Sequence, residues 1–389
     1  MTTALPIQQN DRVVIVDIIR GFALIGVLIA NFTSYNYENL PPSIFDAISS
    51  PLDKALNNFN TVFFEWKFYT LFSILFGYGF GLILSSLEKK NINPNAFFLR
   101  RMFWLFLFGF IHTLFWWGDV LHVYAIAGVF LLGFRKFSSR TILICSLLGM
   151  FIIPPLISYL FRNEQDYFTD ENMKLLYNQY LHGNIIDVFK ANINLYYKAF
   201  LLTGGDLHEI IQVLGRVLFG YFLMRIKLFE SIEGKKSFFK KILFITAPLM
   251  IVYFIIRWLS LQGSMSTNQI YWEPLMKLGI MSTTWFYVSV LTILFIKFGR
   301  TKFFAALQSL GKMTLTNYLL VSAILVTLLY GIGFGQLGIL TISKAWICAF
   351  VWLILEVLFS TFWLKRFRFG PAEWIWRQLT YNRRIQLKK

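Results

Sequence analysis

Charged residues are scarce in this chain. Asp, Glu, Lys and Arg make up 15% of its 389 residues, whereas hydrophobic residues make up 57% and aromatic residues 19%. Soluble domains carry about 25% charged residues, so this composition excludes a soluble globular protein. A polytopic membrane protein is the class that fits.

Cysteine is almost absent. Cys145 and Cys348 lie in separate apolar runs, which excludes a disulfide framework and a thiolate metal site. The sequence also lacks a Gly/Ser-rich or Pro-rich linker and an internal repeat that would divide it. We therefore predict one integral membrane domain over residues 1–389.

Apolar runs long enough to cross about 30 Å of hydrocarbon recur along the chain. None shows the alternating period of barrel strands, so we expect helices, which satisfy their own backbone hydrogen bonds in lipid. The predicted fold is all-α with about ten transmembrane helices, the fourth of them short. The runs lie near residues 13–35, 60–85, 97–115, 119–134, 140–161, 209–228, 238–260, 275–297, 312–334 and 343–364.

Lys and Arg gather in alternate connections between these runs, and the intervening connections are acidic or neutral. The positive-inside rule then places both termini in the cytoplasm. The net charge of +17 follows from this asymmetry and favours contact with anionic membrane lipids, not with nucleic acid. The basic connections contain Lys89, Lys90, Arg100, Arg101, Arg135, Lys136, Arg140, Arg225, Lys227, Lys235, Lys236, Lys240, Lys241, Lys297, Arg300 and Lys302, followed by the tail from Lys365.

The longest connection, residues 162–208, is predicted to be extracytoplasmic and amphipathic. Apolar and aromatic residues recur among polar ones between residues 173 and 202, a pattern typical of one or two helices at the outer interface. Such a segment could be a lid over an outward-facing cavity or a simple tether between two spans.

The first apolar run carries an Asp, an Arg and an Asn, which are Asp17, Arg20 and Asn31. At about 100° per residue they fall on one stripe of a helix, which should face protein. Ionisable groups at membrane depth mark a substrate site, a relay or an ion pair. A structural Asp17–Arg20 pair is as consistent with the spacing as a functional site.

A second polar cluster lies at the outer end of the third and fourth runs. His112 is followed by Trp116, Trp117, Gly118, Asp119 and His122. The spacing lets Asp119 orient an imidazole, which is how a general base is usually built. Interfacial side chains with no chemical role explain the same residues. A three-ligand metal site would need closer convergence and supporting hydrogen bonds, so we predict no metal there.

Other charges lie inside apolar runs. Arg216 and Glu356 could pair with each other or with the Asp17 and Arg20 stripe. Gly77, Gly79 and Gly81 fit close helix packing as well as a phosphate cradle.

Several blocks together resemble the YeiB family, bacterial membrane proteins of unknown function. They are VDIIRGFALIGVLIAN at residues 16–31, KFYTLFSILFG at 67–77, the stretch from Arg100 through His112 to WGDVL at 117–121, GKMTLTNY at 311–318 and FGPAEWIWR at 369–377. The resemblance covers nearly the whole chain and implies a multi-pass protein of the bacterial cell membrane.

The first block is also similar to the opening helix of the transmembrane acyltransferase superfamily. That resemblance implies transfer of an acyl group, such as acetyl, from cytosolic acyl-CoA to an extracytoplasmic hydroxyl or amine of a small molecule or glycan. Some members carry His where this chain has Asn31, and others use a His in the next outer loop. The loop from Tyr35 to Phe64 has no His.

On this interpretation His112, helped by Asp119 or His122, removes the acceptor proton, and Asn31 stabilises the oxyanion. Arg20, Arg100, Arg101, Arg216 and Lys312 receive acyl-CoA, a co-substrate that is not tightly bound. The alternatives are a transporter or flippase of a small or lipid-linked molecule, and a non-enzymatic partner or sensor. A homo-oligomer is compatible with the aromatic surface.

Overall fold

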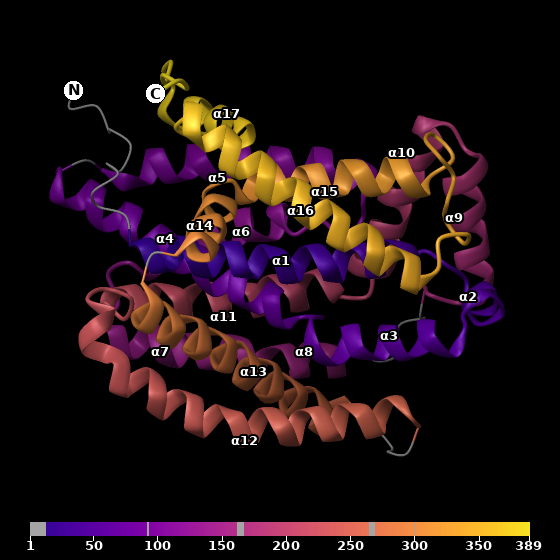
Figure 1. The fold of residues 1–389 in the computed structure, drawn as a ribbon, viewed down its shortest axis with the longest axis horizontal. Helices are drawn as coiled ribbons and strands as arrows, with labels where there is room; N and C mark the ends of the chain where they lie inside the picture. The colour runs from indigo at the N-terminus through magenta and orange to yellow at the C-terminus, as the bar shows by residue number, and fades with distance from the viewer. Residues whose placement is uncertain (1–12, 92, 162–166, 264–268, 300) are drawn as a thin grey trace.

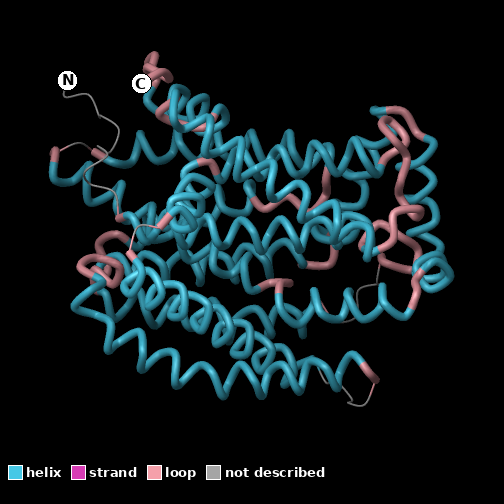
Figure 2. Tube along the Cα trace, viewed as in Figure 1, coloured by secondary structure: helices cyan, strands magenta, loops and turns pink. Residues whose placement is uncertain are grey.

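The computed structural model describes residues 13–91, 93–161, 167–263, 269–299 and 301–389. Within these ranges the chain is a bundle of helices, with one isolated bridge between Phe367 and Lys388 in place of a sheet (Figures 1 and 2). The prediction of an all-α membrane fold is confirmed.

Eight helical segments of the described chain are long and apolar enough to cross a membrane, or nine if one bent helix pair is counted as a single span. The 14-residue α6 is too short at 1.5 Å per residue to span about 30 Å. The long segments are α1 (Val14–Tyr37), α3 with α4 (Pro51–Phe63, Lys67–Lys89), α5 (Pro94–Phe115), α7 with α8 (Ser139–Leu147, Ile153–Leu160), α11 (Gly205–Arg225), α12 (Lys236–Leu261), α13 (Gln269–Phe298) and α16 (Ile342–Arg366); the bent pair is α14 with α15 (Lys302–Lys312, Thr314–Leu329), and α6 is Leu121–Phe134.

The predicted basic connections gather at one end of the bundle, together with the C-terminal helix α17 (Pro371–Tyr381) (Figure 1). Arg135 donates to Asn95 Oδ1 at 2.9 Å, and Arg225 donates to the carbonyl of Phe137. Arg100 reaches the carbonyl of Thr380 at 3.5 Å. We call this the basic end, and the end that holds α2 (Pro42–Ile48) and α9 (Asp170–His182) the outer end.

The run predicted as one span at residues 312–334 contains α15, which follows α14 across a bend of 78° at Met313. The Glu373 carboxylate of α17 accepts hydrogen bonds from the backbone N–H of Leu315 (2.6 Å) and of Thr316 (3.1 Å). A break in a membrane helix needs partners for the backbone groups it releases, and Glu373 supplies them.

Glycines set the closest helix crossings. A Cβ on Gly220 of α11 would lie 1.8 Å from the carbonyl oxygen of Ile74, and one on Gly77 would lie 1.9 Å from that of Val217. A Cβ on Gly311 would lie 1.8 Å from the carbonyl oxygen of Asp17. Close packing thus explains Gly77 without a phosphate cradle.

The outer segment forms two helices, α9 and α10 (Ile185–Tyr196), followed by a π-helical turn, Tyr197–Leu201. Each buries one face against the bundle. Tyr180 stacks on Tyr330 with ring centres 4.4 Å apart, and its carbonyl accepts the N–H of Gly331 at 2.9 Å. The segment therefore packs on the outer end of the bundle; residues 162–166 of the predicted range lie outside the described chain.

Candidate active site

The side chain of Asn192 holds the turn between α5 and α6. This fully buried amide accepts the N–H of Trp117 at 3.2 Å and donates to the carbonyls of Leu114 at 2.9 Å and Val188 at 3.1 Å. The bond to Leu114 satisfies a carbonyl that the end of α5 leaves without a helical partner, and the bond from Trp117 satisfies a backbone N–H of the turn. Through Asn192, α10 fixes the turn that carries Asp119.

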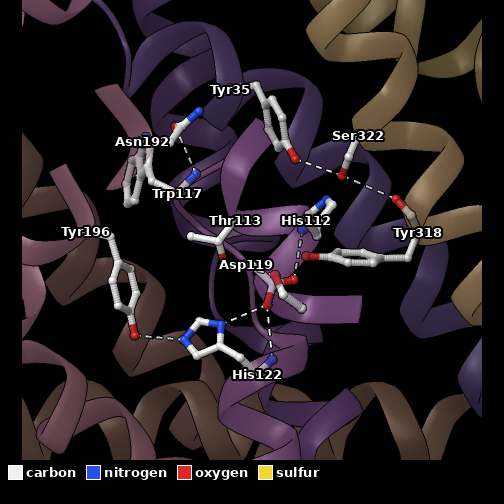
Figure 3. Close-up of polar contacts among 11 residues, drawn as sticks. Tyr35, His112, Thr113, Trp117, Asp119, His122, Asn192, Tyr196, Tyr318 and Ser322 are labelled. Atoms are coloured by element: carbon white, nitrogen blue, oxygen red, sulfur yellow. Dashed lines mark hydrogen bonds and ion pairs between the residues drawn. The ribbon is translucent and has the colours of Figure 1, made fainter. Parts of the chain in front are cut away.

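Asp119 bridges the two predicted histidines (Figure 3). Its Oδ1 lies 2.8 Å from His112 Nδ1, and its Oδ2 lies 2.8 Å from His122 Nδ1. Oδ2 also accepts the backbone N–H of His122 at 3.0 Å. The three residues that the sequence grouped are thus in direct contact, and all three are buried.

The two imidazoles differ in their second ring nitrogen. His122 Nε2 lies 2.9 Å from the hydroxyl of Tyr196 (Figure 3). The Tyr196 hydroxyl in turn donates to Asp206. His112 Nε2 is buried and has no hydrogen-bond partner within the described part of the chain. An imidazole that donates Nδ1–H to a carboxylate keeps a lone pair on Nε2. His112 is therefore the histidine with a nitrogen left to take a proton.

Side chains of α1 and α15 lie next to His112. The Tyr318 ring centre is 5.1 Å from the imidazole, and the Tyr35 hydroxyl donates to Ser322 at 2.7 Å (Figure 3). Asn31 is partly buried one turn before Tyr35 on α1, so the two share a face of that helix. No hydrogen bond joins Asn31 to either histidine in the described chain.

Asp119 is a charged centre at ordinary pH. Burial acts to raise the pKa of its carboxyl, but hydrogen bonds from His112 and His122 outweigh burial and hold the pKa at about 2. The ionised carboxylate fixes the orientation of both rings and stabilises a positive charge on either one.

The contacts between Asp119 and the two histidines are hydrogen bonds, because the Nδ1 atoms of His112 and His122 each point at a different oxygen of the Asp119 carboxylate. Among the described residues, no group of three His, Cys, Asp or Glu side chains is arranged to hold a metal ion. The second ring nitrogen of His122 is engaged by Tyr196.

Asp17 and Arg20 form an ion pair, with Oδ1 and Nη1 3.3 Å apart. Arg20 also donates to the carbonyl of Leu75 at 3.4 Å. This geometry favours the interpretation of Asp17 and Arg20 as a structural pair. Asn31 lies three turns further along α1, in the outer half of the bundle.

The predicted pairing of Arg216 with Glu356 is wrong. Arg216 donates to Gln212 at 2.6 Å and lies over the ring of Tyr69, whereas Glu356 accepts the indole N–H of Trp352 at 3.1 Å. Helix α11 packs against α4, α6 and α7, while α16 packs against α1 and α14. The two helices lie on different sides of the bundle, so neither side chain reaches the other or the Asp17–Arg20 pair.

The basic residues predicted to receive acyl-CoA divide into separate groups. Arg101 stacks on Trp376 of α17 at the basic end, and its charge interacts with that of Arg20. Arg100 is exposed on the same helix, and Lys312 lies at the α14–α15 bend. Arg216 belongs to neither place, because it contacts Gln212 and Tyr69.

Tyr196, Asp206 and Asn192 complete the site but were not among the predicted site residues. They lie more than 70 residues from His122 or Trp117 along the chain. No short-range spacing in the sequence therefore indicates that they join the site. The amphipathic pattern of residues 173–202 and the acidic character of the outer connection were the only signals.

Tyr196 links His122 to Asp206, so its removal should weaken the folded state. We expect Tyr196→Phe to lower the free energy of unfolding by about 1–3 kcal/mol, because the buried His122 and the partly buried Asp206 each lose a hydrogen-bond partner. Tyr197→Phe is the matched control, since Tyr197 is 51% exposed. Denaturation of both variants in detergent measures the difference, and equal stabilities would show that the Tyr196 hydroxyl contributes nothing.

Comparison with known proteins places this chain among proteins without an assigned activity. Residues 223–383 match the family described as "Protein of unknown function (DUF418)". The chain is 28% identical to the uncharacterized protein YeiB of Escherichia coli K12 over 95% of this chain and 96% of that protein. It is 28% identical to the uncharacterized protein YxaH of Bacillus subtilis strain 168, over 98% and 97% of the two chains.

A third relative is an uncharacterized 39.9 kDa protein from the amylase 3' region of Bacillus acidopullulyticus, 29% identical over 99% of both chains. No solved structure matches this chain. The similarity to the three relatives covers 95–99% of this chain. The chain is thus similar over nearly its whole length to the YeiB and YxaH proteins, and its C-terminal part matches the DUF418 family.

Proposed function

We propose that this protein is a transmembrane acyltransferase of the cell membrane. It takes an acyl group from cytosolic acyl-CoA and transfers it to a hydroxyl or amine of an extracytoplasmic small molecule or glycan. The observation that supports this most is the His112 imidazole, which Asp119 holds through Nδ1 and whose buried Nε2 has no hydrogen-bond partner in the described chain. That is the arrangement of a general base.

In the proposed reaction the acceptor O–H or N–H gives its proton to His112 Nε2. The acceptor atom then bonds to the thioester carbonyl carbon, and the C–S bond breaks as the oxyanion collapses. The imidazolium returns its proton to the thiolate, so the products are the acylated acceptor and free CoA thiol. Asn31, on the face of α1 that carries Tyr35, is the proposed donor to the oxyanion.

The proposal assigns the two histidines different roles. His122 is held at both ring nitrogens, by Asp119 and by Tyr196, so it orients Asp119 and does not exchange protons with substrate. The outer helices α9 and α10 cover this part of the bundle, and an acceptor would enter beside them.

The test is acyl transfer in proteoliposomes that contain the purified protein and neutral lipid. Acetyl-CoA and then longer acyl-CoAs are supplied on the face of the basic end, and a panel of sugar and amine acceptors on the other. We expect saturable, acceptor-dependent release of CoA thiol that needs no ion gradient. Absence of release with every donor and acceptor would contradict the proposal.

A transporter or flippase is the second candidate, favoured by one observation. The α14–α15 bend of 78° interrupts a membrane span, and broken helices are typical of alternating-access transporters. In the same proteoliposomes, solute movement that follows an imposed proton or sodium gradient would support this candidate. The rate of acyl transfer, in contrast, should not depend on the ion gradient.

A further inference from the structure

Glu356 is a buried carboxyl side chain in the middle of the membrane-spanning helix α16. Only 2% of the residue is exposed, and it lies more than two helical turns from either end of α16. Its neighbours Leu355 and Leu358 are exposed, on the lipid side of the helix. An ionisable group at this depth is costly and marks a functional site, and the proposed acyl transfer does not use Glu356.

The two oxygens of the Glu356 carboxyl have different surroundings. Oε1 accepts the indole N–H of Trp352 at 3.1 Å. Oε2 is buried and has no hydrogen-bond partner among the described residues. Within the same residues, no Lys, Arg or His forms an ion pair with the carboxyl. One neutral N–H is therefore the only polar contact of this group in the part of the chain that the structure describes.

The nearest polar side chains along α16 and on α15 are occupied by each other. Ser360 lies one turn beyond Glu356, and Asn317 of α15 donates to its hydroxyl at 3.0 Å. The Ser360 hydroxyl lies 3.4 Å from Asn317 Oδ1, to which it can donate in return. Both side chains are fully buried. They satisfy each other and leave Glu356 Oε2 without a partner.

No charged residue of the adjacent helices compensates Glu356. Helix α16 packs against α1, α3 and α14, and α15 contains no charged residue. Asp17 pairs with Arg20 within α1, and Asp53 of α3 accepts the N–H of Ser343 at 2.8 Å, at the outer start of α16. None of the charged residues of these helices forms an ion pair with Glu356; they are Asp17, Arg20, Asp53, Lys54, Lys302 and Lys312.

A proton is the ligand that fits Oε2. An unpaired carboxylate ion in an apolar interior costs far more free energy than a neutral carboxyl group, and a bound proton removes the charge. A calcium or magnesium ion would need about six oxygen ligands. Among the described residues, no group of three His, Cys, Asp or Glu side chains is arranged to hold a metal ion.

We infer that Glu356 is a proton-binding site inside the membrane, protonated in the resting protein and able to release its proton when water or a cation reaches Oε2. Buried carboxyl groups at this depth form the proton relays of pumps and transporters. The site is separate from the His112 cluster, because His112 lies on α5 and α16 packs against α1, α3 and α14. Protonation of Glu356 therefore does not depend on the proposed acyl transfer.

Dicyclohexylcarbodiimide is the probe, because this apolar reagent reaches protonated carboxyl groups from the lipid phase. The carboxyl gives its proton to one nitrogen of the carbodiimide, and its oxygen bonds to the central carbon. The acyl group of the resulting O-acylisourea then migrates to the other nitrogen and forms a stable N-acylurea. No group leaves, so the peptide that contains Glu356 gains the mass of one whole reagent molecule.

The experiment labels the full chain in detergent micelles from about pH 5 to about pH 9 and locates the adduct by peptide mass spectrometry. We expect label on Glu356 that decreases as the pH rises, because only the protonated carboxyl reacts. Glu273 is the matched control: it pairs with His208 and Lys277 and should gain at least tenfold less label. A water-soluble carbodiimide should modify the exposed Glu171 and leave Glu356 unmodified.

A second measurement detects the proton without a reagent. The infrared difference spectrum between the parent and Glu356→Gln at neutral pH should contain the C=O band of a protonated carboxyl that the variant lacks. Glutamine keeps an oxygen that can accept the Trp352 N–H, and equal melting temperatures show that both proteins are folded. The carboxyl band supports the site even where the reagent does not enter. A carboxylate band in its place, or label on Glu273 but not on Glu356, would overturn the inference.

Discussion

Replacement of His112 by alanine is expected to lower acyl transfer by about 10²–10⁴-fold, the usual contribution of a general base. The variant should fold, because Asp119 keeps its contacts with the ring and the backbone N–H of His122. CoA release in proteoliposomes measures the loss, and intrinsic fluorescence with a melting curve measures folding.

The matched control is His182→Ala. His182 lies at the end of α9, away from the two histidines that Asp119 holds, so its removal should leave transfer within twofold of the parent rate. A His122→Ala variant should retain more activity than His112→Ala, since His122 has no nitrogen free for the acceptor. Full activity of His112→Ala, or equal losses in the two variants, would remove His112 from the role of base.

Gly220→Val should destabilise the protein severely. The added Cβ would lie 1.8 Å from the carbonyl oxygen of Ile74, and a backbone atom cannot rotate away as a side chain can. Overpacking typically costs about 1–3 kcal/mol, and this crossing should reach at least about 3 kcal/mol because α4 and α11 must separate.

The control is Gly133→Val, at the end of α6, where a Cβ meets nothing within 4 Å. Both variants replace a helical glycine by valine, so the larger loss of melting temperature in Gly220→Val measures the effect of the helix crossing. Equal melting temperatures for the Gly220→Val and Gly133→Val proteins would show that α4 and α11 do not cross as closely as described.

Their short spacing along the chain was enough to predict that His112, Asp119 and His122 lie close together in space. The three side chains lie close together along the chain, and the turn at Gly118 leaves them few ways to separate. The Asp17–Arg20 pair follows from i,i+3 spacing in the same way. The sequence could not decide which histidine has a ring nitrogen without a partner, because that depends on Tyr196 of α10, which contacts His122.

By itself the sequence determined the membrane class, the helical fold and the segregation of basic connections, since hydrophobicity and charge act along the chain. Tertiary structure alone decided the bend at Met313, the separation of Arg216 from Glu356, and the contacts of Asn192, Tyr196 and Asp206 with the site. Those features depend on which helices are neighbours. In a uniformly apolar bundle, helix order is set by shape, such as the glycine crossings at Gly77 and Gly220, and not by a pattern that can be read along one helix.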